Sequence, residues 1–288
     1  MSSLMLCSSS RVMIALQGLL KQERSMVGDG LLNLPVAWMA VVVFGATYLI
    51  TGGIYLLVTK LAVNERARAF KAVSPGMLPP LGILFALLVG FIAVEVWSNF
   101  DKAKAAVATE ASALRAVVLL AGTFPEEQRA RIYALINSHI EESVNKEWPE
   151  MAQRRATLST LPTALIEELH DTLALKPADD GQRAAQLEMV KALHTALDAR
   201  RQRIVISESA LGTVKWLGIL LQGLCTLIAI AMVHSDNRIA CAITLTLFAT
   251  GIALSVLLIA AYSRPFTSVG PELLKQVIAS EPMVGTTR

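Results

Sequence analysis

The sequence is poor in charged residues. Asp, Glu, Lys and Arg make up 17% of the 288 residues, whereas 54% are hydrophobic, and the mean hydropathy is +0.53. A typical soluble domain carries about 25% charged residues. The composition therefore indicates a membrane protein rather than two ordinary soluble domains.

Residues with catalytic or metal-binding chemistry are also scarce. The three cysteines form neither a disulfide framework nor a zinc spacing, and no two of the four histidines stand four residues apart. Neighbours such as Glu167 and Glu168 diverge by about 100° on a helix, so we expect solvated surfaces rather than a carboxylate dyad. The sequence has no nucleophile elbow, P-loop or dinucleotide-binding turn. We expect no enzyme, no catalytic residue, no metal and no cofactor.

The few charges are concentrated in one stretch. Residues 98–212 hold 14 of the 26 Lys and Arg and 16 of the 23 Asp and Glu. Because acidic residues outnumber basic ones there, the stretch lacks the concentrated basic surface that binds phosphate. We expect no nucleic-acid partner.

The sequence does have four long apolar runs, each long enough to cross a hydrocarbon core. They cover residues 34–58, 81–97, 214–233 and 239–262. The predicted fold is an all-α integral membrane protein with four transmembrane helices and a helical extramembrane bundle inserted between the second and third. The expected boundaries are 1–33 for an N-terminal tail, 34–97 for transmembrane helices 1 and 2, 98–212 for the helical domain, 213–263 for transmembrane helices 3 and 4, and 264–288 for a C-terminal tail.

The second apolar run continues into the polar stretch without a helix breaker. No proline or interior glycine interrupts it after Trp97, so we predict one helix from Leu81 to Ala121. At about 1.5 Å per residue it reaches about 60 Å, against about 30 Å of hydrocarbon. Its second half should therefore project into water.

The apolar half of this helix has two opposite faces. One face carries small residues that allow close helix packing: Gly82, Ala86, Gly90 and Ala93. The other carries larger residues: Leu84, Leu88, Phe91 and Glu95. This second face either contacts lipid or a neighbouring helix, with Glu95 near the headgroups, or lines a hydrophobic constriction at the axis of an oligomer, with Glu95 at its mouth.

Within residues 98–212 the apolar residues recur every three or four positions, which indicates helices throughout. We expect one helix to end near Trp148 and Pro149. A later, longer helix should be capped by Asp179 or Asp180. Its predicted inward side is Leu187, Val190, Leu197 and Ile204, interrupted by His194 and Arg201.

Four spans place both termini and the helical bundle on one side of the membrane. The larger total of Lys and Arg lies on the side of the bundle and favours a cytoplasmic location. The dense group Lys60, Arg66, Arg68 and Lys71 in the short first loop favours the reverse orientation. Charge alone leaves the sidedness open.

Four separated motifs are similar to a known family. They are EVWSNFDKAKAAVATEASAL from residue 95, KEWPEM at 146–151, ALDARRQRIVISES at 196–209, and SRPF followed by SVGPE at 263–272. In this order, over about residues 36–280, the chain resembles the bacterial bestrophin-like domain family of unknown function.

The resemblance implies distant kinship to bestrophins, which are pentameric anion channels with four membrane helices, a helical cytoplasmic region and a hydrophobic neck on the second helix. Leu84, Leu88 and Phe91 are then where the neck falls. A ring of Glu95 carboxylates at its mouth opposes anion passage. The acidic calcium clasp of animal bestrophins has no counterpart after Phe266.

Two functions remain open. The first is a multi-pass inner-membrane protein, surrounded by lipid, assembled as a homo-oligomer (a pentamer by resemblance) and conducting small ions, with a cytoplasmic bundle. The second is a non-conducting membrane scaffold or sensor whose helical domain binds a protein partner.

Overall fold

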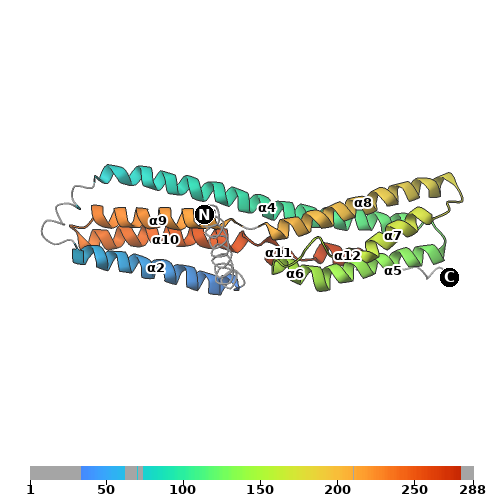
Figure 1. Cartoon of the computed structure of the whole chain (residues 1–288), viewed down its shortest axis with the longest axis horizontal. Coiled ribbons are helices and arrows are strands. Elements are labelled where there is room, and N and C mark those ends of the chain that lie inside the picture. The colour runs from blue at the N-terminus through green and yellow to red at the C-terminus, as the bar shows by residue number, and fades with distance from the viewer. Residues whose placement is uncertain (1–33, 62–69, 71–73, 210, 280–288) are drawn as a thin grey trace, which may run out of the picture. The chain divides into compact units, whose positions relative to one another are not determined.

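The computed structural model describes residues 34–61, 70, 74–209 and 211–279. Within these ranges the chain is helical and has no strand, which confirms the all-α prediction (Figure 1). The longer helices are α2 (Val36–Leu61), α4 (Leu78–Ala121), α5 (Glu126–Glu142), α7 (Thr163–Ala174), α8 (Asp180–Glu208), α9 (Thr213–Val233) and α10 (Arg238–Tyr262). The shorter ones are η1 (Pro75–Met77), the π-helical turn η2 (Ser143–Glu147), α6 (Trp148–Ala152), α11 (Pro265–Ser268) and α12 (Glu272–Ala279).

Some expected features fall outside these ranges. The N-terminal tail at 1–33, the basic residues Arg66, Arg68 and Lys71, and the end of the C-terminal tail from residue 280 lie outside the described residues.

The chain divides into two compact units. Residues 1–90 and 216–261 form what we call the apolar unit, and residues 91–215 and 262–288 form the polar unit. Four helices are long and apolar enough to cross a membrane, namely α2, α4 with η1, α9 and α10. Each overlaps one of the four predicted spans. The helix α4 is uninterrupted over 44 residues, as its sequence predicted.

The apolar unit is packed through small residues. A Cβ atom placed on Gly223 of α9 would lie 3.3 Å from Ile252 Cδ1 of α10 and 3.5 Å from Phe85 Cε2 of α4. The α9 backbone therefore lies in close contact with both α4 and α10 at this glycine. Elsewhere, α2 packs on α10 where Met39 and its neighbours meet alanines such as Ala253. Small residues at helix crossings are typical of membrane interiors.

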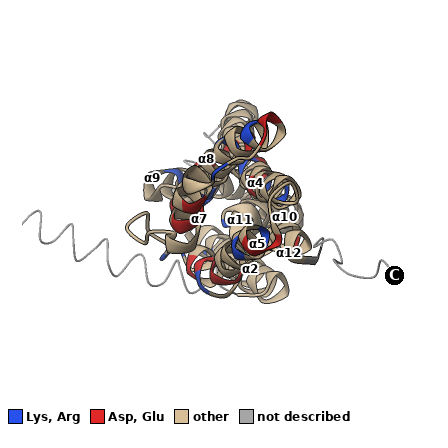
Figure 2. Ribbon diagram, turned by 90° about the vertical axis from the view of Figure 1, so that its right-hand side faces the viewer, with Lys and Arg blue, Asp and Glu red and all other residues tan. Residues whose placement is uncertain are grey.

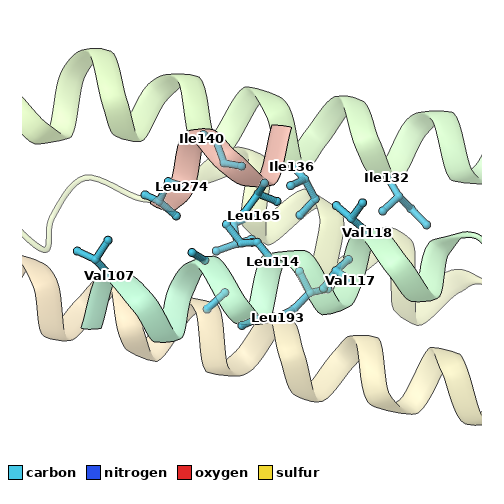
Figure 3. Close-up of a cluster of buried hydrophobic side chains, with 14 of the residues drawn as sticks. Val107, Leu114, Val117, Val118, Ile132, Ile136, Ile140, Leu165, Leu193 and Leu274 are labelled. Atoms are coloured by element: carbon cyan, nitrogen blue, oxygen red, sulfur yellow. The ribbon is translucent and has the colours of Figure 1, made fainter. Parts of the chain in front are cut away.

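The polar unit has a conventional hydrophobic core. Its buried side chains come from α4, α5, α7, α8 and α12 (Figure 3). Leu114, Ile136, Leu165, Leu193 and Leu274 are fully buried and lie in one cluster. The ribbons of α5 and α8 carry both acidic and basic positions, and that of α7 carries acidic ones (Figure 2). Burial of the apolar stripe of each helix is the main stabilising contribution here.

The helix predicted to end near Trp148 continues past it, so that prediction was wrong. The chain passes from α5 through η2 into α6 and ends at Ala152. Pro149 is tolerated because it lies in the first turn of α6, where its missing N–H removes no helical hydrogen bond. The continuation keeps Met151 buried in the core.

The helix α8 begins as predicted, because the Asp179 side chain accepts a 2.7 Å hydrogen bond from the Gln182 N–H. Its predicted inward side was partly wrong, although Ile204 is buried and Leu197 packs on the core as predicted. Leu187 is exposed, and Arg200 and Arg203 are buried instead of Arg201. The remaining buried positions of α8 are Ala185, Met189, Leu193, Ala196, Ala199, Ile204 and Ser207. The error arose because the prediction followed the apolar residues, whereas acidic partners hold Arg200 and Arg203 inside.

The segment after Arg264, expected as a short tail, packs into the polar unit. It forms α11 and α12, with Leu274 and Val277 in the core. The Trp148 Nε1–H donates a 3.0 Å hydrogen bond to the Val269 carbonyl, and the Trp148 ring meets Phe266 edge to face at 5.7 Å. Burying the apolar side chains of this segment against the core stabilises the folded state.

Candidate functional site

The apolar segment of α4 makes few contacts within its own chain. Only 11% of its most apolar window is buried, against 22% for α2, 33% for α9 and 28% for α10. Phe85, Ile92 and Val96 are its buried large side chains. They define the side of α4 that packs on the rest of the chain.

The small-residue face lies beside this packed side rather than on it. Gly82 and Gly90 have no neighbour within 4 Å of an added Cβ, and Ala86 is exposed, whereas Ala93 is half-buried. Within one chain, this face therefore makes no close helix contact at its glycines. The glycine that does make such a contact is Gly223, which sequence reasoning missed.

The four pore-lining candidates lie in different surroundings. Leu84 and Phe91 are exposed, and Phe91, at 72%, is the most exposed side chain among them. Leu88 is half-buried, with its Cδ2 atom 3.7 Å from the position of a Cβ on Gly218. Glu95 is tied to Lys215. Within one chain, Leu84 and Phe91 are therefore exposed, whereas Leu88 contacts α9 and Glu95 pairs with Lys215.

Glu95 and Lys215 form an ion pair between α4 and the start of α9. The Lys215 Nζ atom lies 2.5 Å from both Glu95 oxygens, and both side chains remain about two-fifths exposed at 43% and 44%. The pairing of Lys215 with Glu95 could not be inferred from the sequence, because the two residues are 120 positions apart.

A second group of charges is fully buried in the polar unit. The Arg203 guanidinium donates to both Glu110 oxygens at 2.8 and 3.1 Å and to Glu147 Oε2 at 3.0 Å. Arg200 donates to Glu147 Oε1 at 2.7 and 2.5 Å. We call these two arginines and two glutamates, together with His139, the buried charge cluster. Its carboxylates and guanidinium groups balance one another.

The turn η2 aligns one edge of this cluster. His139, Ser143, Glu147 and Met151 are four residues apart and all buried. In a regular α-helix such a row drifts by about 40° per step, and a π-helical turn, being wider, reverses that drift. The row therefore stays on the side of the helix that faces Arg203. The Arg203 Cζ atom also lies 4.9 Å from the centre of the Trp148 ring.

The Glu110 carboxyl stays ionised inside the core. Burial by itself raises its pKa, but the charge of Arg203 and the hydrogen bonds from His139 and Arg203 outweigh that effect. The net result is a lowered pKa. His139 Nε2 lies 3.1 Å from Glu110 Oε1, so this histidine is satisfied within the fold.

Three sequence motifs supply members of this cluster, and the fourth reaches it through Phe266, which contacts the Trp148 ring. Glu110 lies in the first motif, Glu147 in KEWPEM, Arg203 in ALDARRQRIVISES, and Phe266 in SRPF. Sequence reasoning found the motifs but did not show that their residues come together in the folded chain. The missed signal was the spacing of Arg200 and Arg203, which places both guanidinium groups on one side of a helix.

Glu168 is another buried acid, although it was expected to be solvated. Thr172 donates a 2.9 Å hydrogen bond to its Oε1, whereas Oε2 has no hydrogen-bond partner among the described residues. Burial raises the pKa of Glu168 to about 7, the Thr172 hydrogen bond and Arg131 lower it, and Asp171 raises it further. Glu167, its neighbour, is exposed and pairs with Arg131.

The described residues contain no group of three or more His, Cys, Asp or Glu side chains arranged to hold a metal ion. The buried charge cluster is satisfied by its own members, and its chemistry is that of a structural ion network.

Comparisons with known proteins agree with this architecture. The sequence model described as the bestrophin-like domain matches residues 45–269. Among solved structures, a point mutant of a bacterial bestrophin homologue from Klebsiella pneumoniae matches with a TM-score of 0.61 and 15% identity, over 83% of this chain and 98% of that chain. At this identity the likeness shows a shared fold. No curated protein sequence matches the chain.

Proposed function

The chain belongs to the bestrophin-like family, and from this membership and the small buried share of α4 we propose that it is a homo-oligomeric channel for small inorganic ions. In this proposal α4 lines the pore, the protein lies in the bacterial inner membrane, and the polar unit is cytoplasmic. The family resemblance suggests five copies.

One observation carries the proposal. The most apolar span, α4 with a mean hydropathy of 2.4, is also the span with the smallest buried share. A pore-lining helix at the centre of a ring is expected to be exposed in this way when one copy is taken alone, because neighbouring copies and the pore cover its free sides.

The packed side of α4 orients the rest of the helix. At about 100° per residue, the side opposite Phe85 carries Ile83 and Leu87, and Phe91 lies next to them. These three residues are four apart and are 60%, 52% and 72% exposed. We propose that they form the hydrophobic neck, with Phe91 as its narrowest point.

The two flanks of α4 suit a ring of identical copies. One flank carries the small residues Gly82, Ala86, Gly90 and Ala93. The other carries Leu84 and Leu88. A bulky flank on one copy can pack on the small flank of the next, which is a head-to-tail contact of the kind that closes rings. In this arrangement Leu84 and Leu88 lie between copies, and Phe91 remains at the pore.

Reconstitution into planar lipid bilayers tests the proposal. We expect the purified protein to conduct, and Phe91→Ala to raise the conductance severalfold because the neck becomes wider and less dewetted. Leu49→Ala is the matched control, since Leu49 lies on α2 and is 79% exposed, and it should leave the conductance unchanged.

Two results would contradict the proposal. The wild-type protein could show no conductance above that of empty bilayers at varied pH and calcium concentration, which would favour the non-conducting scaffold or sensor. Alternatively, Leu49→Ala could change the conductance as much as Phe91→Ala, which would remove α4 from the pore.

A further inference from the structure

The Glu95–Lys215 pair lies one helical turn beyond Phe91. Lys215 Nζ is 2.5 Å from both carboxylate oxygens, so it neutralises the carboxylate symmetrically. Both residues belong to the polar unit, as does Phe91. At about 100° per residue Glu95 lies about 40° from Phe91, on the flank that carries Leu84 and Leu88, so it carries a compensated charge at the edge of the pore, one turn past the proposed neck.

An uncompensated carboxylate at this position would act on passing ions. In water, a unit charge about 8 Å from an ion changes the local concentration of that ion about twofold. A ring of such charges, one from each copy, multiplies the effect, and acidic rings select cations. Bound to Lys215, each carboxylate contributes only a weak dipole.

Neighbouring charges do not replace Lys215 in this role. The following bases on α4 are Lys102, which is exposed on the side of Glu95 but seven residues further along, and Lys104, which lies 4.6 Å from the centre of the Phe100 ring. Lys215 is the base that the described structure pairs with Glu95. The charge at this end of the apolar segment therefore depends on that pairing.

We propose that Lys215 sets the ion selectivity of the channel by masking Glu95, a role that rests on the function proposed above. With the pair intact, the mouth of the neck is close to neutral and anions can enter. Without Lys215, the exposed carboxylates shift the preference toward cations. Lys215 is thus a positioning and masking residue rather than a pore-lining one.

The test is the permeability ratio of Na⁺ to Cl⁻, measured from the reversal potential across a tenfold NaCl gradient. We expect Lys215→Gln to raise the ratio at least threefold. The double variant Glu95→Gln with Lys215→Gln should return it to within about twofold of wild type, because no carboxylate is left to expose. Lys215→Arg keeps the positive charge and should preserve the wild-type ratio.

Lys191→Gln is the matched control. Lys191 and Glu188 form an exposed ion pair at 2.7 Å on α8, so this variant removes the same charge and also unpairs a carboxylate, but on a helix without neck residues. It should leave the ratio unchanged. An equal shift in Lys191→Gln would attribute the selectivity to net charge and overturn the proposal.

The remaining outcomes separate this inference from the channel proposal. If the wild-type protein conducts and Lys215→Gln keeps the wild-type ratio, the masking role is wrong and the channel stands. If the wild-type protein does not conduct, both are wrong. A folding defect in Lys215→Gln would lower the channel yield and the melting temperature, whereas it would not produce a ratio that the double variant restores.

Discussion

The two units of this protein are held together in different ways. In the apolar unit no span buries more than 33% of its most apolar window, and α9 contacts α4 and α10 at Gly223. In the polar unit large side chains such as Leu114 and Ile136 are fully buried. The difference reflects the solvent: lipid tails are as apolar as leucine, so burying leucine within the membrane gains little, whereas in water it is the main driving force.

Charged side chains are also paired differently in the core of the polar unit and at the end of the apolar segment. The buried charge cluster of the polar unit gives each carboxylate and guanidinium group several partners at 2.5–3.1 Å. Glu95 and Lys215, at the end of the apolar segment, form a single pair that remains partly exposed. Removing one member of a buried pair leaves an uncompensated charge, whereas a partly exposed pair contributes little to stability.

The largest expected effect comes from breaking the cluster. Arg203→Ala leaves Glu110 with His139 as its remaining partner and removes the arginine from Glu147 Oε2, so we expect a loss of about 3–5 kcal/mol of folding free energy. The melting temperature of the detergent-solubilised protein, followed by tryptophan fluorescence, should fall by about 10 °C.

The control for this variant is Arg201→Ala, which removes an exposed arginine two positions away on α8. It should change the melting temperature by less than about 2 °C. Equal effects of the two variants would show that the cluster does not stabilise the polar unit beyond an ordinary surface charge.

The second effect compares apolar packing in the membrane-spanning part of α4 with packing in its water-exposed part. Leu114→Ala should cost about 2–5 kcal/mol, because Leu114 is fully buried in the core of the polar unit. Ile92→Ala, at a buried position in the apolar segment of α4, should cost less, because lipid solvates the exposed surface. Both are measured as changes in melting temperature.

Leu119→Ala provides the reference for this comparison, since Leu119 lies on α4 but is 67% exposed. It should have the smallest effect of the three. A larger loss for Ile92→Ala than for Leu114→Ala would contradict the solvent argument.

The smallest effect concerns pH. The pKa of Glu168 is about 7 in the folded protein, above its ordinary value of 4.5. Its protonated form therefore stabilises the fold fully below about pH 4.5, and this contribution is lost as the pH rises through about 7. Glu110 acts in the opposite direction, because its lowered pKa gives stability that is lost only as the pH falls below its ordinary range.

Glu168→Gln isolates this contribution. Between pH 5.5 and 8 the wild-type melting temperature should fall more than that of the variant, and at pH 8 the variant should be the more stable protein. Glu167→Gln, which alters the exposed neighbour, should keep the wild-type pH dependence. Parallel pH profiles for wild type and Glu168→Gln would show that Glu168 is already ionised in the folded protein.

Much of the architecture could be predicted because it depends on local properties of the sequence. Four apolar runs exceed the length needed to cross a membrane, and the absence of helix breakers after Trp97 makes α4 continuous. The Asp179 cap follows from a hydrogen bond within one turn. Such features require only neighbours in the sequence.

The errors occurred where a long-range contact decides the outcome. Sequence reasoning assigned Glu168 to solvent and placed Arg201, rather than Arg200 and Arg203, on the inward side of α8, but Glu168, Arg200 and Arg203 are buried. It also expected a tail after Arg264, where α11 and α12 cover the core. An arginine enters a protein interior only when carboxylates compensate its charge, and no local pattern shows that partners 53 and 93 residues away will be there.

The sequence by itself determined the all-α class, the four membrane-length helices and the family, since hydropathy, helix period and ordered motifs are written along the chain. Only the tertiary structure brings residues of three of those motifs, Glu110, Glu147 and Arg203, together in one buried network. It also decided that Glu95 is paired rather than free. The physical reason is that burial and charge compensation are properties of surroundings, and surroundings are made by parts of the chain that are distant in sequence.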